Sequence, residues 1–204
     1  MRLFLIRHGQ SKSNVGHALD TDFPGAELTD LGHEQAAQLV TRLAGEQVDA
    51  VAASSLTRAQ QTAAPVAAHR GHTVLTVDGL REIEAGDLEM RMDTEAHNGY
   101  YQTVMGWAAG DLDRVMPGAG SGHEFLDRYD RAVRALEQAG SRVVAVSHGA
   151  AIRTWVAARC RGLEAAGAAS PSMANTGVMV IEGSTAGGWQ LLAYREEPAD
   201  ELPG

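Results

Sequence analysis

The stretch LFLIRHGQSKSN, residues 3–14, joins a run of four apolar side chains to a segment rich in hydrogen-bonding groups. A short continuous apolar run of this kind is typical of a strand buried on both faces, as in a parallel sheet. Arg7 and His8 come directly after it. Because open α/β sheets bind ligands just beyond the carboxyl ends of their strands, the stretch predicts a strand that delivers a cation and an imidazole to a ligand site.

The rest of the chain repeats this alternation between short apolar runs and longer segments with helical periodicity. Such alternation is typical of an α/β fold, because each helix carries the chain back to the start of the next parallel strand. We therefore expect one domain over residues 1–204, a three-layer α/β/α sandwich with a mostly parallel central sheet and helices on both faces. The predicted strands cover residues 2–6, 48–53, 72–77 and 142–147, with a final hairpin of residues 178–182 and 189–194, and the predicted helices cover residues 30–45, 56–69, 122–138 and 150–161.

One segment departs from the alternation, between the third and fourth predicted strands. Residues 80–122 contain many glycines and methionines and a single helical pattern, over residues 94–109. We expect a helical excursion from the sheet here, of which residues 90–122 or so cap the substrate. Residues 162–173 are expected to form a loop, and residues 195–204, which are acidic and contain proline, a flexible tail.

Composition narrows the class of protein and its partners. Apolar residues make up 44% of the chain and charged residues 21%, which is ordinary for a globular protein. No run reaches the roughly 18 apolar residues of a membrane helix, and no secretion signal precedes the first strand, so we expect a cytoplasmic protein without a membrane partner. The formal charge of -9 disfavours nucleic acid as a partner. The lone Cys160 cannot form an intramolecular disulfide, which agrees with a reducing compartment.

Three further reactive side chains follow the other predicted parallel strands. Arg58 comes after the second strand, Glu82 after the third, and His148 directly after the fourth. Because the carboxyl ends of parallel strands meet at one edge of a sheet, we expect these groups to gather beside Arg7 and His8.

This set of side chains suits phosphoryl transfer. Two guanidinium groups can clamp a phosphoryl group and stabilise the charge on its oxygens. A neutral imidazole can act as the nucleophile, and a second imidazole can donate a hydrogen bond to the transferring group. A carboxylic acid can protonate the departing alkoxide and later take a proton from an attacking water. Such a reaction needs no metal and no cofactor.

The motifs that carry these residues resemble those of the histidine phosphatase superfamily, also called the phosphoglycerate-mutase-like family. Any one of them is a weak signal, but four of them occur in the family's order, each after its own strand, and LTDLGHEQA resembles a further signature of the family. The matching segments are RHGQSKSN at 7–14, LTDLGHEQA at 28–36, SSLTRAQQTA at 54–63, LREIEAGDLE at 80–89 and VSHGAAIR at 146–153.

The resemblance implies a role for each of these residues. His8 would become phosphorylated, with Gly9 leaving room for close approach, and Glu82 would be the general acid and base. Glu84 and Glu89 lie nearby, but the family pattern selects the glutamate four residues before a glycine. The phosphate would be held by Arg7, Arg58, His148, Asn14, Ser11 and the backbone of Gly149 at a helix N-terminus.

The sequence favours hydrolysis over its alternatives. The expected substrate is a small phosphorylated metabolite, hydrolysed by water. A phosphoglycerate mutase is the second alternative, but a mutase must retain a bisphosphate, and residues 90–118 carry only Arg91 and Arg114 as cations. A non-catalytic phosphate- or peptide-binding module is a third, disfavoured because every reactive residue is present.

Two further features of the resemblance concern the rest of the chain. Gly120 stands where the family usually has a glutamate, and Asn175 is expected to fix a loop by hydrogen bonding. Small family members are often dimers, so a homodimer stays an open alternative.

Overall fold

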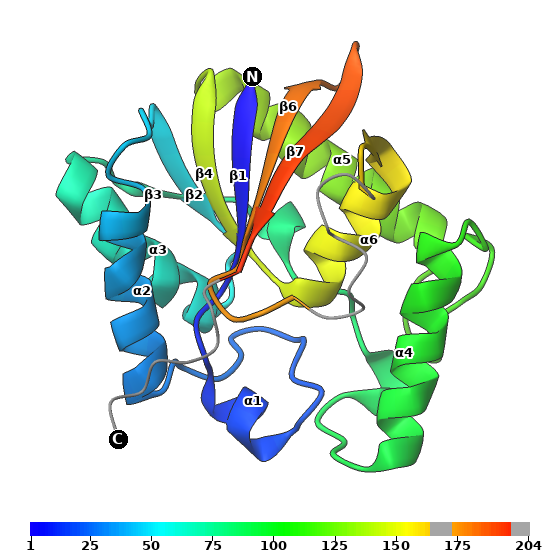
Figure 1. The fold of residues 1–204 in the computed structure, drawn as a ribbon. Helices are drawn as coiled ribbons and strands as arrows, with labels where there is room; N and C mark the ends of the chain where they lie inside the picture. The colour runs from blue at the N-terminus through cyan, green and yellow to red at the C-terminus, as the bar shows by residue number, and fades with distance from the viewer. Residues whose placement is uncertain (164–172, 197–204) are drawn as a thin grey trace.

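The protein is described by a computed structural model over residues 1–163 and 173–196. Within these residues a seven-stranded sheet has the order β3-β2-β4-β1-β6-β7-β5 (Figure 1). The strands β3, β2, β4 and β1 are parallel, β6 is antiparallel to β1 and to β7, and β5 is parallel to β7. The bounds are β1 Arg2–Arg7, β2 Ala50–Ala53, β3 Val74–Thr76, β4 Arg142–Ser147, β5 Cys160–Arg161, β6 Val178–Ser184 and β7 Gly188–Arg195.

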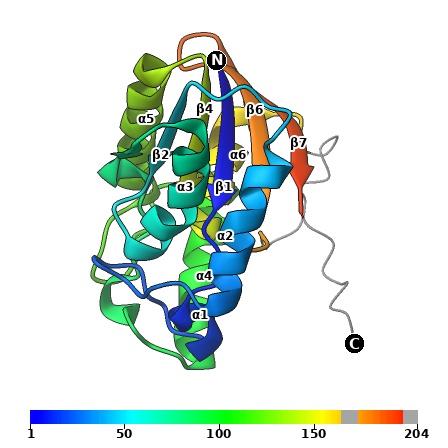
Figure 2. The same ribbon diagram turned by 90° about the vertical axis from the view of Figure 1, so that its left-hand side faces the viewer.

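Helices cover both faces of this sheet, as the predicted three-layer sandwich requires. Helices α2 and α3 lie on one face, whereas α5 and α6 lie on the other (Figures 1 and 2). Helix α4 packs against α6, outside the layered region. The bounds are α1 Lys12–Gly16, α2 Asp30–Arg42, α3 Thr57–Arg70, α4 Thr94–Ala108, α5 Gly122–Ala139 and α6 Gly149–Arg159, with short 3₁₀ turns at Asp78–Leu80 and Gly86–Leu88.

The first strand shows why the opening run of the sequence is apolar on both faces. Leu3 and Leu5 pack into the core beneath α5 and α6, whereas Phe4 and Ile6 pack into the core beneath α2 and α3. All four side chains are fully buried. Each buried leucine, isoleucine or phenylalanine contributes about 1.5–3 kcal/mol of transfer free energy, so β1 is fixed at the centre of the sheet.

Several predicted elements need correction. Residues 12–16, which no predicted element covers, form the helix α1, whose first turn the Ser11 and Asn14 side chains cap reciprocally. Helix α2 ends at Arg42 rather than at residue 45. The last predicted helix ends at Arg159 rather than at residue 161. Cys160 and Arg161 instead pair with β7 as the short strand β5. Strands β2 and β3 are also shorter than predicted, at four and three residues.

The excursion between β3 and β4 contains the predicted helix, α4, which begins at the N-cap Asp93. Backbone hydrogen bonds attach this excursion to the segment before α2: the Leu19 N–H donates to the Arg91 carbonyl at 3.0 Å, and the Met90 N–H donates to the Leu19 carbonyl at 2.9 Å. Within the excursion, the Tyr100 hydroxyl donates to the Ile83 carbonyl, and the Trp107 indole donates to the Arg114 carbonyl. Most of the predicted loop at 162–173 and most of the predicted tail at 195–204 lie outside the described residues. No helix in the described part of the chain is long and apolar enough to cross a membrane.

Candidate active site

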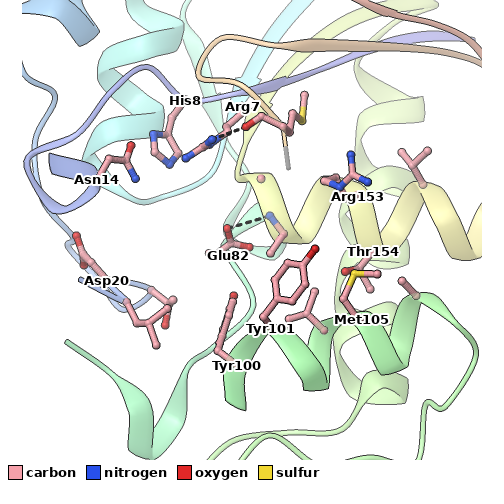
Figure 3. A pocket seen from close by; sticks show the side chains of 18 of the residues that line it. Arg7, His8, Asn14, Asp20, Glu82, Tyr100, Tyr101, Met105, Arg153 and Thr154 are labelled. Carbon is pink, nitrogen blue, oxygen red and sulfur yellow. Dashed lines mark hydrogen bonds between the residues drawn. The ribbon is translucent and has the colours of Figure 1, made fainter. Parts of the chain in front are cut away.

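A cavity of about 290 Å³ opens beyond the carboxyl ends of β1 and β4. Figure 3 shows Arg7, His8 and Asn14 on one side of it and side chains of α4 and α6 on the other. The structure therefore brings together most of the predicted site residues. Those that line the cavity are Arg7, His8, Asn14, Arg58, Glu82 and Gly149.

The His8 ring is held with one nitrogen directed at the protein and the other at a guanidinium. Its Nδ1 lies 2.7 Å from the Gly9 carbonyl oxygen, which can only accept, so Nδ1 carries the ring proton. Its Nε2 accepts a hydrogen bond of 3.1 Å from Nε of Arg58. Burial, together with the charges of Arg58 and Arg7, lowers the pKa of His8 well below its usual value. The ring is thus neutral near pH 7, with its lone pair on Nε2.

Arg58 is anchored by an acid that the sequence did not single out. Its side chain is 3% exposed, and its Nη2 donates to the backbone carbonyl of Asp20 at 2.7 Å. The Asp20 carboxylate lies 3.4 Å from Nη1 of the same guanidinium and also accepts from the Ser13 hydroxyl. Asp20 therefore orients Arg58 and partly balances its buried charge. The loop that carries Asp20 shows no periodic pattern, so only tertiary structure could identify it.

Arg7 ends β1 and extends along the start of α6. Its guanidinium donates to the Met173 carbonyl, and a Cβ on Gly149 would lie only 3.3 Å from its Cδ and Nε atoms. Glycine at position 149 therefore gives the guanidinium room beside the helix. Burial lowers the pKa of Arg7, and the Glu82 carboxylate opposes that shift.

Glu82 faces the cavity from the loop after β3. Its carboxylate accepts from the backbone N–H of Ile83 at 2.9 Å, of Ala150 at 3.2 Å and of Ala151 at 2.8 Å. The last two belong to the first turn of α6, so the helix N-terminus predicted to donate to phosphate holds Glu82 here. Figure 3 shows the carboxylate between α6 and Tyr100.

The backbone that carries Glu82 is fixed by Arg128 of α5. Its guanidinium donates to the carbonyls of Gly79 and Arg81 at 3.0 Å and to that of Glu82 at 2.9 Å. The guanidinium also lies over the Phe125 ring, 5.4 Å from its centre. Sequence analysis did not single out Arg128. The structure shows that it braces the loop of the candidate acid.

His148 lies behind His8 rather than in the wall of the cavity. The two ring centres are 5.1 Å apart, and His148 is fully buried. Its Nε2 lies 2.9 Å from the Ser54 hydroxyl, and its Nδ1 has no hydrogen-bond partner within the described protein. An unpaired buried nitrogen beside His8 can serve a bound ligand.

Ser11 differs from its prediction. It is fully buried as the N-cap of α1, where its hydroxyl accepts from the Asn14 backbone, and it does not line the cavity. Ser13, two residues on, lines it instead. The Asn14 side-chain oxygen accepts from Ser11 and from Asn175, which leaves its amide group to donate. Asn175 also donates to the His8 carbonyl at 3.0 Å, so it fixes the loop as predicted.

Two further observations concern other residues. Gly120, where the family usually has glutamate, lies just before α5 and outside the cavity wall. Within residues 1–163 and 173–196, no group of three His, Cys, Asp or Glu side chains is placed to hold a metal ion.

The part of the cavity beyond these groups is mainly apolar. Helix α4 supplies Tyr101 and Met105, and α6 supplies Thr154 and Ala157, with Arg153 at the margin (Figure 3). These residues have no motif, because they are brought together only by the packing of α4 on α6.

Comparison with known proteins agrees with this geometry. The chain is 34% identical over 151 residues to an adenosylcobalamin/alpha-ribazole phosphatase of Escherichia coli K12, covering 72% of this chain and 73% of that protein. It is 32% identical over 161 residues to a probable phosphoglycerate mutase of Escherichia coli O1:K1, covering 74% and 71%.

Solved structures give the same result. A mycobacterial glucosyl-3-phosphoglycerate phosphatase, solved with VO3, superposes with a TM-score of 0.76 at 26% identity, covering 94% of this chain and 97% of that one. The alpha-ribazole phosphatase of Shigella flexneri superposes with a TM-score of 0.70 at 27% identity, covering 95% of each chain. The family described as histidine phosphatase superfamily (branch 1) matches residues 3–197. Because this match spans nearly the whole chain, the chain belongs to the histidine phosphatase superfamily.

Proposed function

We propose that the protein is a metal-independent phosphatase that hydrolyses phosphomonoesters of small metabolites through a phosphohistidine at His8. The observation that carries this proposal is the neutral His8 ring, whose Nε2 faces Arg58 at 3.1 Å while its Nδ1 proton is held by the Gly9 carbonyl. Arg7 and Arg58 supply the positive charge that a phosphoryl group needs. A mycobacterial phosphatase of the same fold was solved with VO3, a phosphate-like oxyanion, which supports a phosphorylated substrate for the proposed reaction.

The first chemical step transfers the phosphoryl group to His8. The Nε2 lone pair forms a bond to phosphorus as the bond between phosphorus and the ester oxygen breaks. Glu82 gives its proton to the departing oxygen, which leaves as the alcohol. Arg58 exchanges its bond to Nε2 for bonds to the phosphoryl oxygens. A Ser54 hydroxyl that donates to Nε2 of His148 would place the His148 proton on Nδ1, where it can donate to the same oxygens.

The second step returns the enzyme to its starting state. Water attacks the phosphohistidine while Glu82 takes one of its protons, and the bond between phosphorus and Nε2 breaks. Inorganic phosphate is released, His8 regains its neutral form, and Glu82 is again protonated. In this reaction α4 and the excursion around it cap the cavity and shape the space for the alcohol.

Hydrolysis is favoured over mutase chemistry by the charges of the cavity. The described residues that line it include three arginines, Arg7, Arg58 and Arg153, and two carboxylates, Asp20 and Glu82. Two of the arginines serve the first phosphoryl group. A bisphosphate held for a second transfer would lack a matching second cluster of cations, and it would face the Asp20 carboxylate.

Phosphoenzyme trapping tests this proposal directly. Rapid acid-free quenching of the protein with a ³²P-labelled phosphomonoester should give a label that is stable in alkali and lost in acid, and phosphate release should continue in EDTA. His8→Ala should abolish both, whereas His69→Ala, an exposed residue of α3, should retain both. Labelling that persists in His8→Ala, or turnover that requires bisphosphoglycerate, would contradict the proposal.

A further inference from the structure

The walls of the cavity indicate what kind of alcohol the substrate contains. Tyr101 and Met105 project from α4 with 42% of each side chain exposed, which is unusual for apolar groups of this size. Across from them, α6 presents Val156 and Ala157. Figure 3 shows Tyr101 and Met105 facing the space between α4 and α6, on the far side from His8. An exposed apolar lining inside a cavity is the usual form of a small-molecule site.

The charge of the cavity is concentrated at the phosphoryl end. Arg7, Arg58, Asp20 and Glu82 surround His8, and Arg153 is the further charged residue of the described lining. A second phosphate or a carboxylate close to the ester would meet the Asp20 carboxylate and the protonated Glu82 rather than a second pair of guanidinium groups. The electrostatics thus disfavour compact polyanionic metabolites.

One hydroxyl in this wall, that of Thr154, has no hydrogen-bond partner among the described residues. Thr154 is 1% exposed and lines the cavity, yet its Oγ1 has no hydrogen-bond partner in the described structure. A helical threonine commonly donates to a carbonyl one turn earlier, as Thr103 of α4 does to Gly99. Leaving a buried hydroxyl unpaired costs about 1–3 kcal/mol, so a bound polar atom would recover that free energy.

From these observations we propose that the substrate is the phosphomonoester of an alcohol with a compact apolar body, either aromatic or aliphatic, that carries a hydrogen-bonding group for Thr154. The body lies between Tyr101 and Met105 of α4 and the facing side of α6. The cavity of about 290 Å³ is at the small end for ligand sites, which suits one ring system. This proposal rests on the proposed phosphatase activity and adds the class of its substrate.

Three esters of primary alcohols test the apolar body: 2-phenylethyl phosphate, ethyl phosphate and 3-phosphoglycerate. Their leaving groups are similar, so differences in kcat/KM report binding of the alcohol. We expect 2-phenylethyl phosphate to exceed ethyl phosphate by at least about tenfold, and 3-phosphoglycerate to be the poorest of the three. Met105→Glu should lower the ratio of phenylethyl to ethyl ester by about tenfold. Met92→Glu, on an exposed methionine outside the cavity, should leave that ratio unchanged.

A second set of esters tests the Thr154 hydroxyl. Phenylethyl phosphates with a ring hydroxyl at each of three positions should include one that the protein prefers to the unsubstituted ester. Thr154→Ser should keep that preference and Thr154→Val should lose it. Thr154→Val should also unfold at an equal or higher urea concentration, because no protein hydrogen bond is removed. A preference that survives in Thr154→Val, or a fall in stability, would overturn the role of this hydroxyl.

The possible outcomes distinguish a failure of the proposed substrate class from a failure of the proposed phosphatase activity. Release of phosphate from all three primary esters with equal kcat/KM would overturn the substrate class and leave the phosphatase intact. No release from any ester, with no label on His8, would overturn both.

Discussion

At the scale of single residues, the side chains predicted to react are held in place by neighbouring side chains and backbone groups. A backbone carbonyl keeps the proton of His8 on Nδ1, which leaves Nε2 free for the attack that we propose, and Asp20 anchors Arg58 beside it. Glu82 is placed by three backbone N–H groups, and its loop by Arg128. Such second contacts fix reactive atoms to within the small tolerance that phosphoryl transfer allows.

The identity of the acid is testable by substitution. Glu82→Gln keeps the shape but removes the transferable proton, so kcat/KM for an alkyl phosphomonoester should fall by about 10²–10⁴. The loss should be smaller for p-nitrophenyl phosphate, whose leaving group departs without a proton. Glu84→Gln is the matched control, because that side chain is half-exposed and pairs with Arg81 outside the cavity. Equal losses for the two esters would show that Glu82 is not the acid.

At the scale of elements, the loop that carries His8, Gly9 and Gln10 is held by direct contact with α2. A Cβ on Gly9 would lie 2.6 Å from the carbonyl oxygen of Gly32, and one on Gly32 would overlap the carbonyl oxygen of Gln10. The glycine after His8 was expected to leave room for close approach at the phosphate. The structure shows that its missing side chain makes room for the first turn of α2.

This contact predicts a large effect from one methyl group. Gly32→Ala should force the first turn of α2 away from the loop that carries His8, Gly9 and Gln10. The free energy of unfolding should therefore fall by about 1–3 kcal/mol, and kcat should fall with it. Gly45→Ala, just after α2, meets nothing within 4 Å and should leave both nearly unchanged. Urea unfolding and phosphatase assays measure the two effects. A Gly32→Ala variant as stable and active as Gly45→Ala would contradict the packing argument.

At the scale of the whole molecule, burial of charged and titratable groups couples the site to stability. His8 and His148 are both almost inaccessible to solvent. Burial lowers the pKa of each well below its usual value, and the charge of Arg58 adds to both shifts. Below the unfolded pKa of about 6.5, the unfolded chain therefore carries a proton on each of these imidazoles, whereas the folded protein keeps both neutral.

This difference predicts the direction of the pH dependence. Because both folded pKa values are lowered, their effect on stability is absent above the unfolded value of about 6.5 and grows as the pH falls below it. Each imidazole should cost up to about 1.4 kcal/mol per pH unit, so the free energy of unfolding should drop between pH 7.5 and 5.5. His8→Asn should reduce the drop by about half, whereas His69→Asn should not. An equal drop in His8→Asn and the original protein would contradict the assignment.

The sequence by itself determined the α/β class, the helices on both faces and the positions of the reactive groups. It could do so because apolar periodicity specifies elements locally, and because parallel topology brings the ends of β1 and β4 to one edge. Arg7, His8, Arg58 and Glu82 needed no further information to be placed together, since each follows its own strand. Their catalytic roles stay predictions until the substitutions above are made.

Only the tertiary structure decided which side chains support these groups and which line the rest of the cavity. Ser11 does not line the cavity, because its hydroxyl caps α1. Asp20 and Arg128 support the predicted groups and Thr154 lines the cavity, although no sequence motif marks any of the three. Asp20 contacts Arg58 of α3, Arg128 of α5 contacts the loop after β3, and Thr154 of α6 lines a cavity that α4 completes, so these contacts join residues far apart in the chain. Local sequence propensity does not predict such contacts, because they form and stabilise the fold only after the helices have packed together.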